Sequence, residues 1–263
     1  MTISSFLKGA GVVGLALCFS ASTALATDLF DRSASMKDAP EASSDRPELS
    51  ANVAITNDYV FRGFSQTDEH AAIQGGFDVT YKMFYAGVWA SNLDFGGDGN
   101  GNDIADIEID VYAGIKHKWQ ITEFDLGVIY YAYPDAVDPG AELDYVEIKF
   151  ATSTELSNNI SVSTATYYSP EYTGETGETL AYEGSISVGL GEHGRFAPTF
   201  SALIGYVDFL DNAFDDLSYT YWNAGVEIGL GDKFALDLRY WGTDVDDVDI
   251  ADDRFVATLS ASF

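Results

Sequence analysis

The stretch that decides the fold is residues 254–263, which read R-F-V-A-T-L-S-A-S-F. Side chains alternate sides along an extended strand, so every second residue from Phe255 to Phe263 lies on one face and is Phe, Ala or Leu. The other face carries Val256 followed only by Thr and Ser. Because an unpaired strand edge promotes aggregation, this strand needs a partner on each side. We therefore expect it to pair with the first strand of the sheet and close a barrel.

Further segments with the same alternation fill the chain between residues 50 and 242. The clearest is 105–117, where Ile107, Ile109 and Val111 alternate with Glu108 and Asp110. The sequence predicts an all-β fold: a transmembrane, antiparallel up-and-down β-barrel of about 12 strands over residues 50–263. The expected strands before the last one are 50–62, 72–82, 84–95, 105–117, 121–133, 143–152, 160–169, 180–190, 197–208, 218–230 and 233–242.

The connections between these segments alternate in length. Short turns at Met83, 118–120, 157–159, 191–194 and 231–232 alternate with longer acidic connections, among them 135–142 and 244–253. Outer-membrane barrels have short periplasmic turns, long external loops and an even number of strands. The pattern therefore predicts a barrel in the outer membrane of a Gram-negative cell, with both termini in the periplasm.

Charge and cysteine content exclude several classes of function. The formal net charge is −29, which repels nucleic acid. Cys18 is the single cysteine, so the chain has no disulfide framework. Beyond the amino-terminal segment no apolar run is long enough for a membrane helix, so any crossing of a bilayer has to be made by strands.

The amino terminus has the pattern of a secretory signal peptide over residues 1–26. Lys8 precedes the apolar run 9–19, and Ala24-Leu25-Ala26 forms an A-x-A cleavage site. A lipoprotein signal acylated at Cys18 is the alternative, but Leu17 is bulkier than the small residue that processing normally needs. Residues 27–49 lack periodicity and predict a flexible periplasmic lead-in.

The charged faces of the strands are expected to line the interior, because a Lys or Arg facing lipid at the bilayer midplane costs about 2 to 4 kcal/mol. The apolar faces then meet lipid, and aromatic residues near strand ends, such as Tyr81, Phe84, Tyr85, Trp119, Tyr240 and Trp241, form interfacial girdles. The predicted pore-lining residues are Asp78, Lys82, Glu108, Asp110, Asp125, Glu147, Lys149, Glu183, Glu227, Asp237 and Arg239.

The opening strand region resembles a known family. The run N-D-Y-V-F-R-G-F-S-Q-T at 57–67, then Q-G-G at 74–76 and G-V-W-A-S-N at 87–92, resembles the signature of the TorF-type porins of Gram-negative outer membranes. Residues 130–134 and Phe263 also match. The resemblance implies an outer-membrane barrel surrounded by lipid and lipopolysaccharide, and a terminal Phe263 that the barrel assembly machinery recognises. It does not name a substrate.

No residue pattern points to catalysis, to a cofactor or to a dedicated metal site. His70, His117 and His193 stand beside no Ser or Asp in a catalytic order. The run 98–103 fails the EF-hand test because Asp103 replaces the required glycine, and Ile109 replaces the bidentate Glu. The acidic run 244–253 is expected to be a hydrated loop, with loose binding of divalent ions as the alternative.

Two interpretations of Arg62 and Gly63 stay open: a guanidinium at the pore mouth that pairs with loop carboxylates, or a turn glycine with an Arg at the strand end. The leading function is a channel for passive diffusion of small solutes or ions. Acids outnumber bases on the predicted inner face, which favours cations. A structural or adhesive barrel with a plugged interior is the alternative, because small barrels can be filled by their own side chains.

Overall fold

The computed structural model describes residues 46–96, 104–134, 136, 142–192, 194–211, 213–214 and 217–263. The predicted signal peptide 1–26 and most of the lead-in 27–49 lie outside these ranges. Within them, no helix is long and apolar enough to cross a membrane.

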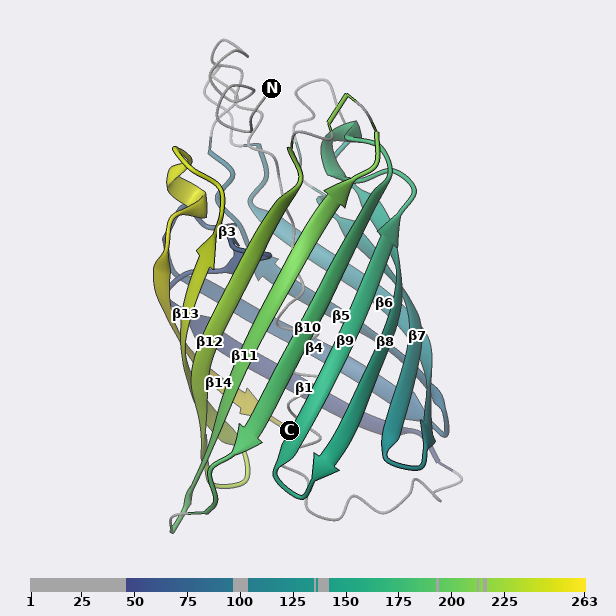
Figure 1. Cartoon of the computed structure of the whole chain (residues 1–263), viewed down its shortest axis with the longest axis vertical. Helices are drawn as coiled ribbons and strands as arrows, with labels where there is room; N and C mark the ends of the chain where they lie inside the picture. The colour runs from purple at the N-terminus through teal and green to yellow at the C-terminus, as the bar shows by residue number, and fades with distance from the viewer. Residues whose placement is uncertain are drawn as a thin grey trace.

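Twelve strands of the described chain form one closed antiparallel barrel, as predicted (Figure 1). Each pairs with the next along the chain, and β1 pairs with β14. The barrel strands are β1 (Glu48–Thr56), β4 (Ala72–Tyr81), β5 (Phe84–Asn92), β6 (Ile107–Trp119), β7 (Thr122–Ala132), β8 (Tyr145–Ser157), β9 (Ile160–Ser169), β10 (Thr179–Gly189), β11 (Phe196–Phe209), β12 (Tyr219–Leu230), β13 (Phe234–Thr243) and β14 (Arg254–Ser262).

Closure occurs where the sequence predicts it. β14 pairs with β13 on one side and with β1 on the other, in a register that places Asn52 opposite Ser262 and Thr56 opposite Thr258. Two backbone hydrogen bonds extend the seam, from Ala51 N to Phe263 O at 3.1 Å and from Phe263 N to Ala51 O at 2.9 Å. The seam leaves the barrel without an open sheet edge, so each of its twelve strands has a neighbour on both sides.

The first expected strand, 50–62, was predicted too long. The chain leaves the barrel wall after Thr56, and two short strands, β2 (Val60–Phe61) and β3 (Phe64–Ser65), form a separate hairpin. Arg62 and Gly63 reverse the chain between them, with φ angles of 44° and 90°. Pairing of β1 with both neighbours stops at Thr56, where the chain bends at residues 57–58. The two positive φ angles form the tight turn of the separate hairpin.

The outside of the barrel is apolar, as predicted. Phe255, Leu259 and Phe263 of the closing region are 56 %, 50 % and 65 % exposed. Tyr81, Phe84, Trp119 and Tyr240 are also exposed, as expected of interfacial aromatics. Two other residues predicted for the girdles are not part of them. Trp241 is buried and Tyr85 turns inward to donate a hydrogen bond to Asp125, because both fall on the inward parity of their strands.

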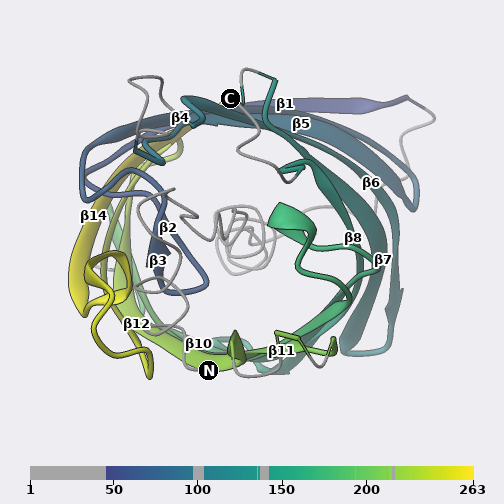
Figure 2. The same ribbon diagram turned by 90° about the horizontal axis from the view of Figure 1, so that it is seen from above.

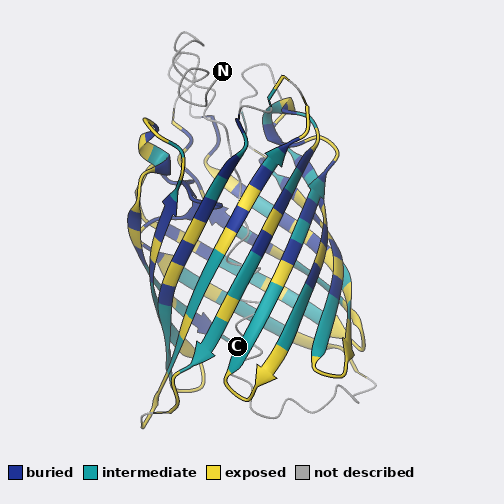
Figure 3. Cartoon of the chain, viewed as in Figure 1, coloured by how far each residue is buried: buried dark blue, intermediate teal, exposed yellow. Residues whose placement is uncertain are grey.

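The two ends of the barrel differ. One end carries the tight turns and is called the turn end; the other carries the long connections and is called the loop end (Figure 1). Inward-facing residues are buried near the loop end and only half-buried toward the turn end (Figure 3). On β10, for example, Ala181 and Glu183 are buried while Ser185 and Ser187 are half-buried. The interior is therefore filled most densely at the loop end.

An arginine placed on the outer face should test the membrane-facing surface. Val128→Arg, in the middle of β7, should lower the free energy of unfolding by about 2 to 4 kcal/mol in a lipid bilayer. Leu156→Arg, at the turn end of β8, should lower it by only about 0 to 1 kcal/mol, because charges near the interface reach water. Denaturant unfolding of the refolded protein in vesicles measures both. Equal losses would show that this face does not lie in a bilayer.

Candidate functional site in the barrel interior

The connection between β1 and β4 folds into the barrel instead of extending away from it. Figure 2 shows β2 and β3 inside the ring of strands. We call residues 57–71 the inner hairpin. Val60, Phe61, Phe64 and Ser65 at its core are all buried, so it packs against the surrounding wall. It forms because the apolar pair Val60-Phe61 and Phe64 flank a two-residue turn.

The tip of the inner hairpin can only be built with glycine at position 63. A Cβ atom there would lie 2.2 Å from Thr243 Cγ2 and 3.1 Å from Tyr221 Cβ. The φ angle of 90° disfavours any other residue as well. Gly63 therefore lets the tip touch the wall formed by β12 and β13. Arg62 has a positive φ of 44°, which costs about 1 kcal/mol for a residue with a side chain.

Arg62 extends from the tip to the opposite part of the wall. Its Nη1 and Nη2 donate to Glu147 Oε1 and Oε2 at 2.8 and 3.0 Å, a bidentate pair buried on both sides. The guanidinium carbon lies 4.6 Å from the centre of the Phe61 ring and 4.9 Å from that of Tyr167. Both π faces stabilise the cation. The ion pair fixes the tip of the hairpin to β8.

Burial and charge act in opposite directions on Arg62. Burial lowers the pKa of the guanidinium, but the charge and hydrogen bonds of Glu147, together with Tyr172 and Tyr221, hold the pKa well above its ordinary value. Arg62 Nη1 also donates to Tyr172 Oη at 3.4 Å, from the connection between β9 and β10. Burial raises the pKa of the Tyr172 phenol. The site thus contains a permanent cation and a neutral phenol.

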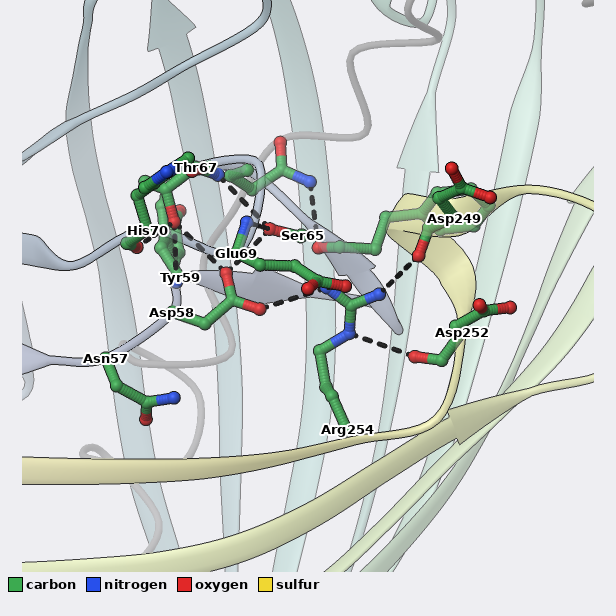
Figure 4. A network of polar contacts seen from close by, with 12 residues as sticks. Asn57, Asp58, Tyr59, Ser65, Thr67, Glu69, His70, Asp249, Asp252 and Arg254 are labelled. Atoms are coloured by element: carbon green, nitrogen blue, oxygen red, sulfur yellow. Dashed lines mark hydrogen bonds and ion pairs between the residues drawn. The ribbon is translucent and has the colours of Figure 1, made fainter.

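A second ion pair holds the base of the hairpin (Figure 4). Asp58 accepts hydrogen bonds from Ser65 Oγ at 2.6 Å, Thr67 Oγ1 at 3.1 Å and Arg254 Nη1 at 3.0 Å. Arg254 is the first residue of β14, and it also donates to the carbonyl oxygens of Asp249 and Asp252. The base of the hairpin is therefore attached to the closing strand and to the connection that precedes it.

Tyrosine rings fill the space around the Arg62–Glu147 pair. Tyr131 stacks on Tyr145 with ring centres 4.3 Å apart, and Tyr145 meets the edge of Tyr172 at 4.8 Å. Tyr131 Oη donates to Glu147 Oε2 at 3.0 Å. Across the interior, Phe64 of the hairpin meets Tyr219 at 5.1 Å. Hairpin and rings together occupy space in the loop-end half of the interior.

Most of the other charged groups inside the barrel have specific partners. Lys149 pairs with Asp125 at 2.7 Å, and Arg239 Nη2 pairs with Asp237 at 2.9 Å. Tyr221 Oη donates to Glu183 at 2.6 Å. Glu108 accepts from Tyr59 and Tyr133, both at 3.2 Å, and burial together with the charges of Glu108 and Asp110 raises the pKa of Tyr59. Neither carboxylate oxygen of Asp110 has a hydrogen-bond partner.

All but one of the predicted pore-lining residues face the interior. The inward-facing ones are Asp78, Glu108, Asp110, Asp125, Glu147, Lys149, Glu183, Glu227, Asp237 and Arg239. The exception is Lys82, which the structure places in the turn after β4. It has a φ of 56° and is exposed, with its ammonium 5.0 Å from the Tyr81 ring. Lys82 does not line the interior because the strand ends one residue before it.

Both interpretations of the Arg62-Gly63 pair are partly right. Gly63 is a turn glycine, and Arg62 does form an ion pair, but with a strand carboxylate deep in the barrel and not with loop carboxylates. Sequence reasoning missed Asp58, Arg254 and the buried tyrosines. The one available signal was the density of tyrosine on the inward parity of several strands.

The remaining polar groups considered in the sequence are mostly structural or lie at the surface. His70 and His117 are exposed, while His193 and the run 98–103 lie outside the described residues. Asp68, His70 and Asp94 come close enough together to share a metal ion, but all three are exposed. In the acidic run 244–253, Asp244 accepts from Thr220 N and Asp253 accepts from Tyr240 Oη.

An apolar exterior and a polar interior, in a closed antiparallel barrel, define a porin-like transmembrane β-barrel. Residues 39–263 match the family described as "Bacterial protein of unknown function (Gcw_chp)", and the chain belongs to this family. No curated protein matches the chain.

Solved porins have a similar fold. The KdgM porin matches with a TM-score of 0.53 at 6% identity, covering 81% of this chain and 98% of that one. A KdgM structure in complex with disordered oligogalacturonate matches with a TM-score of 0.51 at 6% identity, covering 83% and 98%. The NanC porin matches with a TM-score of 0.50 at 9% identity, covering 82% and 99%. At these identities the likeness concerns the fold.

The fit of Gly63 against the wall can be tested by adding and then removing one methyl group. Gly63→Ala should lower the free energy of unfolding by about 1 to 3 kcal/mol, from backbone strain and from the contact with Thr243 Cγ2. Thr243→Ser removes that methyl group and keeps the hydroxyl, so the double variant should recover part of the loss. Thr243→Ser alone is the control. Thermal unfolding measures all three, and an undiminished loss in the double variant would contradict the contact.

Proposed function

We propose that this protein is an outer-membrane channel for passive diffusion of small solutes or ions, preferring cations, in which the inner hairpin narrows the path. The main support is the excess of acidic over basic side chains inside the barrel. Among the described residues, the inward-facing acids and Asp58 of the hairpin outnumber the inward-facing bases. The acids are Glu48, Asp58, Asp78, Glu108, Asp110, Glu123, Asp125, Glu147, Glu155, Glu183, Glu227 and Asp237; the bases are Arg62, Lys116, Lys118, Lys149, Arg239 and Arg254.

Acid excess raises the local concentration of cations and repels anions. Paired acids contribute little net field, so the preference depends on the acids that exceed the available bases. The interior also disfavours polyanions. Oligogalacturonate is the ligand in the similar KdgM structure, and as a chain of sugar acids it would meet repulsion here. The proposed cargo is therefore a cation or a small neutral solute.

The proposed location of the protein is the outer membrane. The resemblance to TorF-type porins supports a location in the Gram-negative outer membrane, reached by a secreted precursor whose residues 1–26 are removed. In that setting the turn end and both termini face the periplasm, while lipid and lipopolysaccharide contact the apolar exterior. Phe263, outward-facing and 65 % exposed, is available to the assembly machinery. We assign no catalytic role to any residue.

A barrel with a permanently plugged interior is the second candidate. The observation that favours it is the dense packing of the hairpin, in which Phe61, Arg62 and Phe64 are no more than 2% exposed. The two candidate functions differ in whether the hairpin can move aside and let a solute pass. Substitutions that detach the hairpin from the wall distinguish them.

Release of the hairpin should increase conductance. The double substitution Arg62→Ala with Glu147→Gln removes the ion pair without leaving one partner charged, and it should raise single-channel conductance in a planar bilayer above that of the wild type. Lys82→Gln removes one charge outside the interior and should leave conductance unchanged. Conductance absent from every variant, with folding verified by heat-modifiable migration, would favour the plugged barrel.

Cation preference should appear in the reversal potential under a salt gradient. The wild type should show the sign of cation selectivity, and Asp78→Asn with Glu227→Gln should move the potential toward zero. The effect should weaken at high salt, because the Debye length falls from about 10 Å at 0.1 M to about 3 Å at 1 M. A potential of the opposite sign, or one unchanged by the substitutions, would refute the proposed preference.

A further inference from the structure

Among the described residues, the acids Glu108 and Asp110 of the interior form a pair that no base neutralises. Glu108 and Asp110 lie two positions apart on β6, so their side chains leave the same face about 7 Å apart. Both point inward near the loop end, and both are 0% exposed. Asp110 lies between Trp89 of β5 and Tyr131 of β7 in the strand register. Tyr59 of the inner hairpin covers the pair and donates to Glu108 at 3.2 Å.

The buried cations near the loop end are committed to other acids. Arg62 forms its bidentate pair with Glu147, and Arg254 pairs with Asp58. Lys149, farther along the wall, pairs with Asp125. The described neighbours of the acid pair include the phenols of Tyr59, Tyr131 and Tyr133, the indole of Trp89 and the carboxylate of Glu147, and none of these is a base. In the part of the chain that the structure describes, no ion pair involves Glu108 or Asp110.

Hydrogen bonding compensates only one of the two acids. Glu108 accepts hydrogen bonds from the phenol hydroxyl groups of Tyr59 and Tyr133. Asp110 Oδ1 and Oδ2 are both buried without a hydrogen-bond partner. A buried carboxylate without a donor or a counter-charge is strongly disfavoured, and a second carboxylate two residues away makes it worse. A positive group has to share this space when both acids are ionised.

We propose that Glu108 and Asp110 bind a hard divalent cation of the calcium type beneath the inner hairpin. The available ligand atoms are all oxygens, which selects Ca²⁺ or Mg²⁺ over softer metals. Ca²⁺ accepts irregular coordination more readily than Mg²⁺, and an irregular set of carboxylates and phenols suits it better. The cation is held by β6, and Glu108 connects it to the hairpin by accepting a hydrogen bond from Tyr59. It would stabilise the packed hairpin whether or not the barrel conducts.

Luminescence of Tb³⁺, used as a substitute for Ca²⁺, tests the site by position. Trp89 is the expected sensitiser, because it is the strand neighbour of Asp110 and its ring lies 5.5 Å from that of Tyr59. Excitation of tryptophan in the refolded protein should give saturable Tb³⁺ emission that Ca²⁺ competes away. Trp89→Phe should remove the emission while Ca²⁺ still stabilises the protein. Emission that survives Trp89→Phe would place the ion elsewhere and overturn the proposal.

Matched substitutions identify the ligands. Asp110→Asn and Glu108→Gln should each weaken Tb³⁺ binding by more than about tenfold, because even the outer partners of metal ligands contribute that much. Asp94→Asn, in the exposed group of Asp68, His70 and Asp94, should leave it unchanged. Loss of binding in Asp94→Asn and retention in Asp110→Asn would assign the ion to the barrel mouth and refute the interior site.

Thermal unfolding gives a readout that does not depend on luminescence. Ca²⁺ should raise the Tm of the wild type relative to EDTA, because a ligand that binds only the folded state stabilises it. Asp110→Asn should abolish this rise, and in EDTA it should unfold at a higher temperature than the wild type, since it removes the repulsion. A wild-type Tm that is the same with Ca²⁺ and EDTA would mean that a shared proton, not a metal, neutralises the pair. That result would overturn the proposal.

Discussion

Closure of the sheet between β1 and β14 is the constraint on which the rest of the structure depends. A lipid environment offers no hydrogen bonds, so every backbone amide and carbonyl of a spanning strand must find its partner within the protein. The β1–β14 seam supplies the last set of partners. Once the ring is closed, the alternation of each strand fixes which side chains meet lipid and which meet the interior. The same strand pairing therefore produces both the apolar exterior and the charged interior.

The charged side chains of the interior are costly unless they are paired. Charged side chains that would be solvated on a soluble protein are enclosed by a wall with low polarisability, where an unpaired charge is costly. Ion pairs between different elements offset this cost: Arg62 with Glu147, Arg254 with Asp58, and Lys149 with Asp125. Tyrosine hydroxyls supply donors to several of the acids. The result is a specific network that determines where the inner hairpin lies.

The wall of the barrel could be predicted from the sequence, because a period of two is local information. Strand β6 illustrates this: the alternation of Ile107, Ile109 and Val111 with Glu108 and Asp110 fixes its facing without reference to any other segment. The inner hairpin could not be predicted in the same way. Val60 and Phe61 continue the apolar pattern of β1, but in the structure they pair with Phe64 and Ser65 and not with the wall.

The partners inside the barrel were also beyond sequence reasoning. Arg62 and Glu147 are 85 residues apart, and their meeting depends on the diameter of the ring and on the inward fold of a loop. For Lys82 the sequence prediction failed because the strand was predicted too long. This residue follows the inward parity of β4, but the strand ends at Tyr81, so the parity no longer applies. Alternation predicts facing only within the limits of a strand, and those limits depend on pairing.

The bond between Asp58 and Arg254 has a consequence for the order of assembly. These residues are 196 positions apart, and they come together only when the last strand has reached the first. Before that moment Asp58 has no cationic partner, and the hairpin can be held only by its contacts with earlier strands, such as those of Tyr59 with Glu108 and of Arg62 with Glu147. The attachment of the base of the hairpin to β14 is therefore among the last contacts that assembly makes possible.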